Sequence, residues 1–199
     1  KDNGYKNITA IDIENILKIK HDDFSTGDMT KNLPMEDNSV DTFVCIDGIE
    51  HIDEQFHFIK ESARVLKVGG ELIISTPNIS SLRSRWRWLM TGHHNKCKSP
   101  LDENKPTPLH HIGMISFPEI RYLLHTNNLI IKHISTNRIK PINWLYSIIL
   151  PLSFLYTSLS YKKSGRKENT EAINQEVKIS MFSLSVLFGE TLIIRAVKE

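Results

Sequence analysis

The sequence predicts an α/β fold with a largely parallel sheet, in which short strands alternate with helices. Leu72–Ile74 is an apolar run without polar alternation, which is typical of a strand covered on both faces. Before it, Gln55–Leu66 has apolar residues at helical spacing and predicts an amphipathic helix. Gly69 and Gly70 lie between the two, and we expect them to end the helix because glycine adopts the left-handed conformation without strain.

The N-terminal part predicts two brief strands and a third, longer one. Ile8–Ile11 forms the first, which ends at Asp12, and a second lies around Phe24. A short helix or turn over Glu14–Lys20 separates them. Thr42–Ile46 follows a cluster of turn residues and predicts the third strand.

The C-terminal part continues the alternation. Pro77 ends the strand that begins at Gly70, because proline cannot donate to a sheet ladder. Pro118 is placed to open a helix, and Asn127 with Asn128 is placed to end it. Two late strands are expected, at Leu129–Ile134 and Leu192–Val197.

Composition narrows the class of protein. The 199 residues are enough for one domain with a core, and a net charge of +2 gives no reason to expect a nucleic-acid partner. Two cysteines, Cys45 and Cys97, make no disulfide framework, so we expect a reducing, cytoplasmic setting. Lys1–Asn7 is polar and lacks the apolar segment of a signal peptide.

Two aspartates are candidates for ligand binding. Asp12 is expected at the carboxyl end of a strand, where a carboxylate can accept both hydroxyls of a ribose. Asp28 is expected just past the next strand, where it can accept an adenine amino group. Each also has a structural interpretation, Asp12 as a helix N-cap and Asp28 in an Asx turn.

Taken together, the segments ITAID, GDMTKNLPMEDNSVDTFVCIDGIEHID and ESARVLKVGGELIISTPN resemble class I S-adenosylmethionine-dependent methyltransferases, in the branch that includes the quinone-biosynthesis enzymes. The resemblance is close over residues 8 to 80 and looser from His111 onward. The residues in register with the family pattern are Asp12, Asp28, Leu33, Pro34, Asp37, Ser39, Asp41, Glu50, His51, Arg64 to Lys67, Gly69 and Gly70.

The resemblance implies S-adenosylmethionine as cofactor and assigns roles to particular residues. Asp12 would hold the ribose, Asp28 and the Met29 backbone the adenine, and Ile46 the methionine end. The implied cofactor-binding residues are Asp12, Ile13, Asp28, Met29 and Ile46, and the implied catalytic residues are Glu50 and His51. His51 would act as general base for a hydroxyl acceptor, and the alternative is a structural histidine that holds the loop.

One family feature is missing from this sequence. The glycine-rich loop that cradles the methionine part follows the first strand of the family's sheet, whose order is 3-2-1-4-5-7-6, and nothing before Asp12 supplies it. We therefore expect a Rossmann-like sheet without its first strand, in a truncated enzyme. The alternative is a non-catalytic relic of the fold that serves as a binding or interaction module.

Two other clusters are compatible with a metal site or a nucleic-acid contact, but neither pattern is specific. The histidines His93, His94, His110 and His111 with Cys97 match no standard zinc spacing, so no metal is predicted. The run RSRWRW, residues 83–88, is short and is not surrounded by further basic residues. It favours a lid helix or a contact with a membrane interface over nucleic acid.

Ile142–Tyr161 is twenty residues without a charge, long enough to cross a bilayer. Its serines, Asn143 and the central Pro151 favour two short helices that cap the acceptor pocket. The expected apolar stripe consists of Ile142, Leu145, Ile149, Leu152 and Leu159, followed by the basic residues Lys162, Lys163, Arg166 and Lys167. Peripheral membrane contact through residues 142–167 is expected, and a membrane anchor is the alternative.

These observations predict three parts: a partial methyltransferase core over 1–136 with a substrate lid beginning at 80–110, a hydrophobic helical cap over 137–190, and a last core strand over 191–199. The predicted function is methyl transfer from S-adenosylmethionine to a small-molecule or lipid-linked acceptor.

Overall fold

The computed structural model describes residues 7–15, 23–97, 99–168 and 170–199. The strands are β1 Ala10–Asp12, β2 Phe24–Thr26, β3 Val40–Ile46, β4 Leu66–Pro77, β5 Leu129–Thr136 and β6 Thr191–Lys198. The α-helices are α1 Gln55–Val65, α2 Leu82–Thr91, α3 Phe117–His125, α4 Leu150–Glu168, α5 Glu171–Met181 and α6 Leu184–Phe188, and the 3₁₀ helices are η1 Ile49–His51 and η2 Pro141–Ile149. The helix expected over Glu14–Lys20 falls largely outside the described residues.

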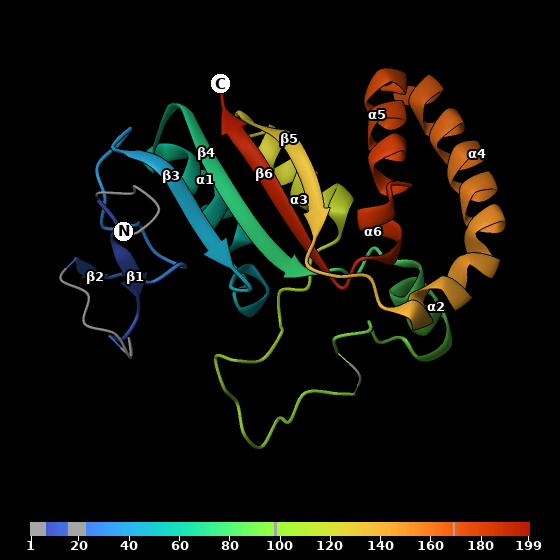
Figure 1. Cartoon of the computed structure of the whole chain (residues 1–199), viewed down its shortest axis with the longest axis horizontal. Helices are drawn as coiled ribbons and strands as arrows, with labels where there is room; N and C mark the ends of the chain where they lie inside the picture. Colours follow the sequence, from blue (N-terminus) through green and yellow to red (C-terminus); the bar gives the residue numbers. More distant parts are fainter. Residues whose placement is uncertain (1–6, 16–22, 98, 169) are drawn as a thin grey trace.

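The strands form two sheets (Figure 1). β1 and β2 pair in parallel, and the other four strands have the order β3-β4-β6-β5. β3 is parallel to β4, while β6 is antiparallel to both of its neighbours. In the expected order 3-2-1-4-5-7-6, β1 and β2 correspond to strands 2 and 3, and the order β3-β4-β6-β5 corresponds to strands 4-5-7-6. Among the described residues no strand lies between β1 and β3, and the fold class predicted from the sequence is confirmed.

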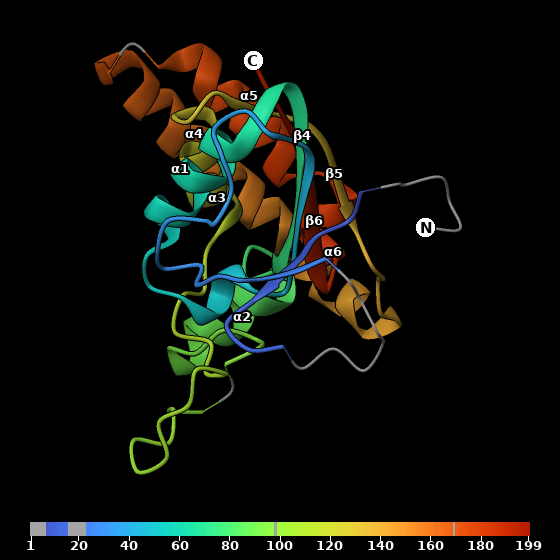
Figure 2. The same ribbon diagram turned by 90° about the vertical axis from the view of Figure 1, so that its left-hand side faces the viewer.

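α1 and α3 cover one face of the four-stranded sheet (Figure 2). Phe58 of α1 and Phe117 of α3 are fully buried there against Leu72 and Ile194. The opposite face of β3 is open: Val44 is 53% exposed. The hydrophobic effect therefore anchors both helices to the sheet and fixes the strand ends on which the site depends.

The predicted last residue of α1, Leu66, was one residue too late, and the prediction that Gly69 and Gly70 end this helix was wrong. The helix ends at Val65, and Leu66 is already extended. Gly69 does adopt the left-handed conformation, with φ of 80°, but it lies inside a bulge of β4, where the register against β3 shifts. Gly70 is tightly packed in the same bulge: a Cβ added at this position would lie 3.1 Å from the Asp41 carbonyl oxygen. The glycines thus serve the strand pairing, because a bulge inserts residues that need positive φ.

The segment after β5 is helical. η2 leads into α4, with Pro151 in the first turn of α4, and α4 pairs with α5 as a hairpin at the side of the sheet (Figure 1). The apolar residues expected on one stripe divide between two faces. Ile149 packs against the cluster of Leu82 and Phe188, whereas Leu145 and Leu152 are about 70% exposed. That single-stripe prediction is therefore corrected.

Candidate active site

The carboxyl ends of β1 and β2 bring together the first group of predicted residues. Asp12 is in register with Thr26, and the Gly27 N–H donates to the Asp12 carbonyl at 3.0 Å. The Asp12 carboxylate is exposed and accepts the N–H of Ile13 at 2.7 Å. Asp28 follows Gly27, so two carboxylates lie close to the same sheet edge, the usual ligand-binding edge of an α/β fold.

Asp28 is partly committed to its own turn. Its Oδ1 accepts the Thr30 N–H at 2.8 Å and the Thr30 hydroxyl at 2.7 Å. These hydrogen bonds, the backbone one first, lower the pKa of Asp28, so the carboxylate is charged at neutral pH. The Asx-turn interpretation is therefore correct for Oδ1, while Oδ2 accepts no hydrogen bond from the described residues.

Met29, which follows β2 in the sequence, contacts the core of the four-stranded sheet. Its side chain packs against the main core, and its sulfur lies 3.5 Å from the position that a Cβ would take at Gly48. Gly48 belongs to the turn after β3, next to Ile46, which is 61% exposed. Ile13, at the end of β1, is 60% exposed. Each sheet thus presents an exposed apolar side chain at its carboxyl edge.

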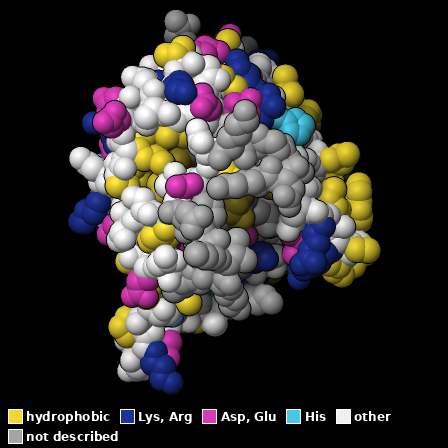
Figure 3. Space-filling model, turned by 60° about the vertical axis from the view of Figure 1, so that its left-hand side comes forward, with side chains coloured by type: hydrophobic (Ala, Val, Ile, Leu, Met, Phe, Trp, Pro, Cys, Tyr) yellow, Lys and Arg dark blue, Asp and Glu magenta, His cyan; other side chains and the backbone are white. Residues whose placement is uncertain are grey.

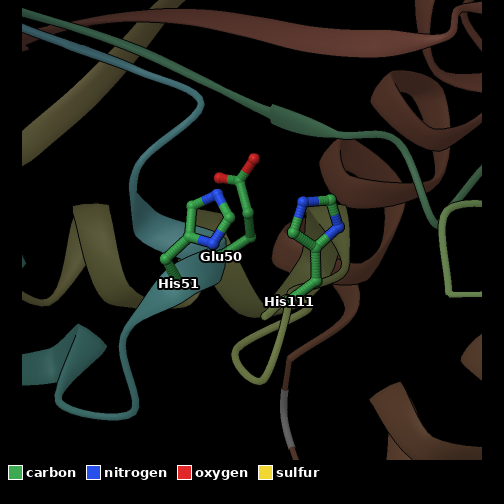
Figure 4. A group of neighbouring side chains, drawn as sticks. All are labelled: Glu50, His51 and His111. Atoms are coloured by element: carbon green, nitrogen blue, oxygen red, sulfur yellow. The ribbon is translucent and has the colours of Figure 1, made fainter. Parts of the chain in front are cut away.

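The turn after β3 forms η1, and the Glu50 and His51 side chains project from it side by side toward the His111 ring (Figure 4). Glu50 is 1% exposed, and its Oε2 has no hydrogen-bond partner among the described residues. Burial is the main reason that the pKa of Glu50 is raised. His51 is half-buried, with Nδ1 3.2 Å from the His110 carbonyl oxygen.

His111 forms the second wall of this site. Its ring meets the His51 ring edge-on, with centroids 4.8 Å apart. The neighbouring Gly113 holds the loop in place: its N–H donates to the Glu50 carbonyl at 2.9 Å, and its carbonyl accepts the Gln55 amide. A Cβ at Gly113 would lie 2.1 Å from the Ile52 carbonyl, so only glycine permits this approach.

Glu50, His51 and His111 also offer a potential metal site. One ligand atom from each lies within 4.8 Å of the others. A tetrahedral ion with bonds of ~2.0–2.2 Å needs ligand atoms roughly 3.3–3.5 Å apart, so these side chains would have to move to bind one. The sequence prediction of no metal stays a prediction.

The other histidines considered above, with Cys97, do not assemble into a metal site among the described residues. Within the described ranges, no metal-sized group includes His93, His94 or Cys97. His94 instead lies 3.2 Å from the Ser84 hydroxyl, and burial lowers its pKa. Cys45 is buried beneath η1, and burial raises the pKa of its thiol to about 12, which makes it a poor nucleophile.

The basic and aromatic run lies on α2, which follows β4. Arg85 donates to the Ser80 carbonyl at 2.7 Å and to the Ser153 hydroxyl of α4 at 2.8 Å. Trp86 and Trp88 are exposed on the same helix. Arg85 therefore joins α2 to α4, a structural role that sequence reasoning did not assign. Whether α2 serves as a lid stays a prediction.

Part of the chain is similar in sequence to known methyltransferases. Residues 1–74 match the family described as methyltransferase domain. A probable S-adenosylmethionine-dependent methyltransferase of Mycobacterium tuberculosis is 50% identical over 46 residues, which are 23% of this chain and 17% of that protein. A relative from Mycolicibacterium smegmatis is 48% identical over 46 residues, 23% of this chain and 18% of its own length. The resemblance predicted from the sequence is confirmed.

Two solved structures illustrate the partial similarity to known folds. A methyltransferase of Thermotoga maritima aligns with a TM-score of 0.47 and 16% identity, covering 88% of this chain and 63% of that one. A methyltransferase of Methanosarcina mazei aligns with a TM-score of 0.47 and 17% identity, covering 88% and 66%. The chain thus spans less than two thirds of the Thermotoga structure and matches a short segment of its curated relatives.

Proposed function

We propose that this chain, whose residues 1–74 belong to the methyltransferase domain family, is part of an enzyme that transfers a methyl group from S-adenosylmethionine to a small-molecule or lipid-linked acceptor. The observation that carries the proposal is the pair of strand ends that place Asp12 and Asp28 on one side and Glu50 and His51 on the other. Met29, which follows Asp28, packs against the core beside Gly48 and so brings the first group toward the turn that carries the second.

The described residues fit part of the cofactor. Among the described residues the exposed Asp12 carboxylate accepts one hydrogen bond, from the adjacent Ile13 N–H, so it can accept the two ribose hydroxyls as charge-assisted hydrogen bonds. The exposed side chains of Ile13 and Ile46 offer apolar contact, and Asp28 with the Met29 backbone would meet the adenine. When bound, the cofactor supplies a sulfonium methyl that is already activated, so alignment provides most of the acceleration.

His51 is suited to remove a proton from the acceptor. Because a carbonyl only accepts hydrogen bonds, the contact with His110 requires the proton of neutral His51 to lie on Nδ1. Nε2 then keeps its lone pair and can take the proton of a hydroxyl or amine as the methyl group arrives. The buried carboxylate of Glu50 would stabilise the imidazolium that forms, because opposite charges attract strongly at low dielectric.

The free cysteines and the exposed apolar helices support a cellular location and an acceptor class for the enzyme. Cys45 and Cys97 are both free, which supports a reducing, cytoplasmic environment. A lipid-linked acceptor is supported by the exposed apolar side chains of η2 and α4.

The test uses the full-length protein and two substitutions. Calorimetry should detect S-adenosylmethionine binding, and Asp12→Asn should weaken it at least tenfold with little change in melting temperature, because the ribose loses a charged acceptor. His51→Gln should retain cofactor binding while methyl transfer to a hydroxyl acceptor falls by about 10²-fold or more. Unchanged affinity in the Asp12 variant would contradict the assignment, and binding without any turnover in the wild-type protein would favour the non-catalytic relic.

A further inference from the structure

An exposed apolar stripe runs the length of η2 and α4. We call it the outer stripe; its residues are Leu145, Ile148, Leu152, Leu155 and Leu159, which are 56% to 82% exposed. Their spacing alternates between three and four, so they follow one helical face. Figure 3 shows hydrophobic side chains gathered at the right-hand edge of that view, over η2. A contiguous patch of this kind marks a contact surface in a folded protein.

Aromatic side chains extend the stripe toward α2. Trp144 of η2 is 50% exposed, and Tyr156 of α4 is 74% exposed. A hollow of about 330 Å³ between α2 and η2 has Trp86 and Tyr146 in its lining together with Arg83. Tryptophan and tyrosine are favoured where a protein meets the headgroup region of a membrane, because each has an apolar body and a polar tip.

Basic residues bracket the outer stripe. Arg138 precedes η2, Lys162 and Lys163 follow the stripe on α4, and all three are exposed. From Arg138 to Lys163 the sequence contains no aspartate or glutamate. This arrangement is complementary to a surface that is apolar below and negatively charged at its headgroups.

We propose that the outer stripe docks on the surface of an anionic lipid bilayer. The inference does not depend on methyl transfer, since it concerns a surface outside the strand ends described above. The occupant is a bilayer surface because an apolar stripe with aromatic and basic borders is the pattern of a helix that lies in the membrane interface.

The packing of α4 favours lying on the membrane over crossing it. Pro141–Gly165 is one helix that is long and apolar enough to span a bilayer, judged by length and composition alone. However, the Tyr161 carbonyl of α4 accepts the Asn174 amide of α5 at 3.1 Å, and Phe154 meets Phe182 edge-on at 5.0 Å. A crossing α4 would either break these contacts or draw a polar, charged α5 into hydrocarbon.

α5 is in turn attached to the sheet domain. Glu176 of α5 lies 2.6 Å from the Arg121 guanidinium of α3, and Arg121 is 8% exposed as a residue. The α4–α5 hairpin is therefore held beside the core, with the outer stripe facing away from α5.

The experiment measures vesicle binding by the full-length protein. Sedimentation with phosphatidylcholine vesicles containing 30% phosphatidylglycerol should retain at least tenfold more protein than phosphatidylcholine alone. Ile148→Glu/Leu152→Glu should reduce this binding at least tenfold, and Lys162→Glu/Lys163→Glu should reduce it about tenfold or more in a salt-sensitive way. All four positions are exposed, so melting temperatures should stay close to that of the wild type.

The matched control is Val68→Glu. Val68 is 75% exposed, like the stripe residues, but lies in the bulge at the start of β4, away from η2 (Figure 1). This variant should bind vesicles as the wild type does. Cofactor binding, measured on the same variants, should not change, so failure here is distinguishable from failure of the methyltransferase assignment.

Several results would overturn the proposal. Equal binding to neutral vesicles would remove the anionic component, and unchanged binding by both stripe variants would place the contact elsewhere. Extraction from cells only by detergent would indicate a spanning helix. A dimer that Ile148→Glu/Leu152→Glu converts to a monomer, without vesicle binding, would show that a second copy covers the stripe.

Discussion

Glu61 and Glu50 lie in the same β3–α1 region, and the protein treats their two buried carboxylates in opposite ways. Glu61, 6% exposed, accepts the Leu33 N–H at 2.9 Å and two N–H groups of Arg64 at 2.7 and 2.9 Å. The Arg64 hydrogen bond is the main cause of its lowered pKa. Glu50, 1% exposed, keeps an oxygen without a partner among the described residues, and burial raises its pKa.

This difference separates structural motif residues from functional ones. Arg64 also donates to the carbonyls of Leu33 and Met35 and to the Asp37 carboxylate, so it fastens the loop before β3 to α1. Those residues carry much of the family resemblance and act in folding. A buried carboxylate oxygen without a hydrogen-bond partner destabilises a fold, so the presence of one at Glu50 is consistent with a functional site.

Removing the partner of Glu61 should have the largest effect on the free energy of unfolding. Arg64→Ala removes every guanidinium hydrogen bond to Glu61 and leaves that carboxylate buried, so the free energy of unfolding should fall by about 3 kcal/mol. Urea denaturation provides the measurement. The matched control is Lys67→Ala, whose exposed ion pair with Asp41 should contribute less than about 1 kcal/mol. Equal losses in the two variants would contradict the structural role of Arg64.

A substitution in the loop that holds His111 beside Glu50 should have the next largest effect on the free energy of unfolding. Gly113→Ala places a Cβ against the Ile52 carbonyl and should displace the loop that holds His111, at a cost of about 2 kcal/mol and with reduced methyl transfer. Gly92→Ala is the control: its φ is 68° but nothing lies within 4 Å of the added Cβ, so it should cost about 1 kcal/mol and leave turnover intact. Both are read by chemical denaturation and by turnover. A Gly113 variant as active as the Gly92 variant would show that the loop is not part of the site.

The sequence predicted the six described strands and the helices α1 and α3 well, because their signals are local, whereas α5 and α6 were not predicted as separate helices. Apolar runs, Pro118 and Asn128 each act over a few residues, and Asn128 does adopt positive φ. The end of α1 was misplaced because Gly69 serves the pairing with β3, which depends on a distant segment. A local rule cannot distinguish a helix end from a bulge when both need a left-handed glycine.

The candidate site was predicted only in part. The family resemblance pointed to Asp12, Glu50 and His51, but His111 was considered only as a metal ligand, because its position depends on a contact between Gly113 and Glu50 far along the chain. The sequence also offered no indication that Asn78 is structural, yet its buried amide donates to the carbonyls of Val186 and Gly189. For His111, the available signal in the sequence was Gly113, which lies shortly before the segment that opens α3.

Removing the unpaired charge itself should have the smallest effect on stability, and with the opposite sign. The pKa of Glu50 is raised in the folded state, so the folded protein favours the protonated carboxyl group. The free energy of unfolding therefore decreases as the pH rises from the ordinary carboxyl pKa to the pKa of Glu50 in the folded state. Glu50→Gln keeps the shape without the charge and should raise the free energy of unfolding by about 1 kcal/mol at pH 7, while methyl transfer falls. Denaturation curves between pH 4 and 7 should show the gain shrinking toward acid, where the wild-type carboxyl is protonated as well. A variant that is less stable at pH 7, or whose gain does not depend on pH, would show that Glu50 is a paired structural residue like Glu61.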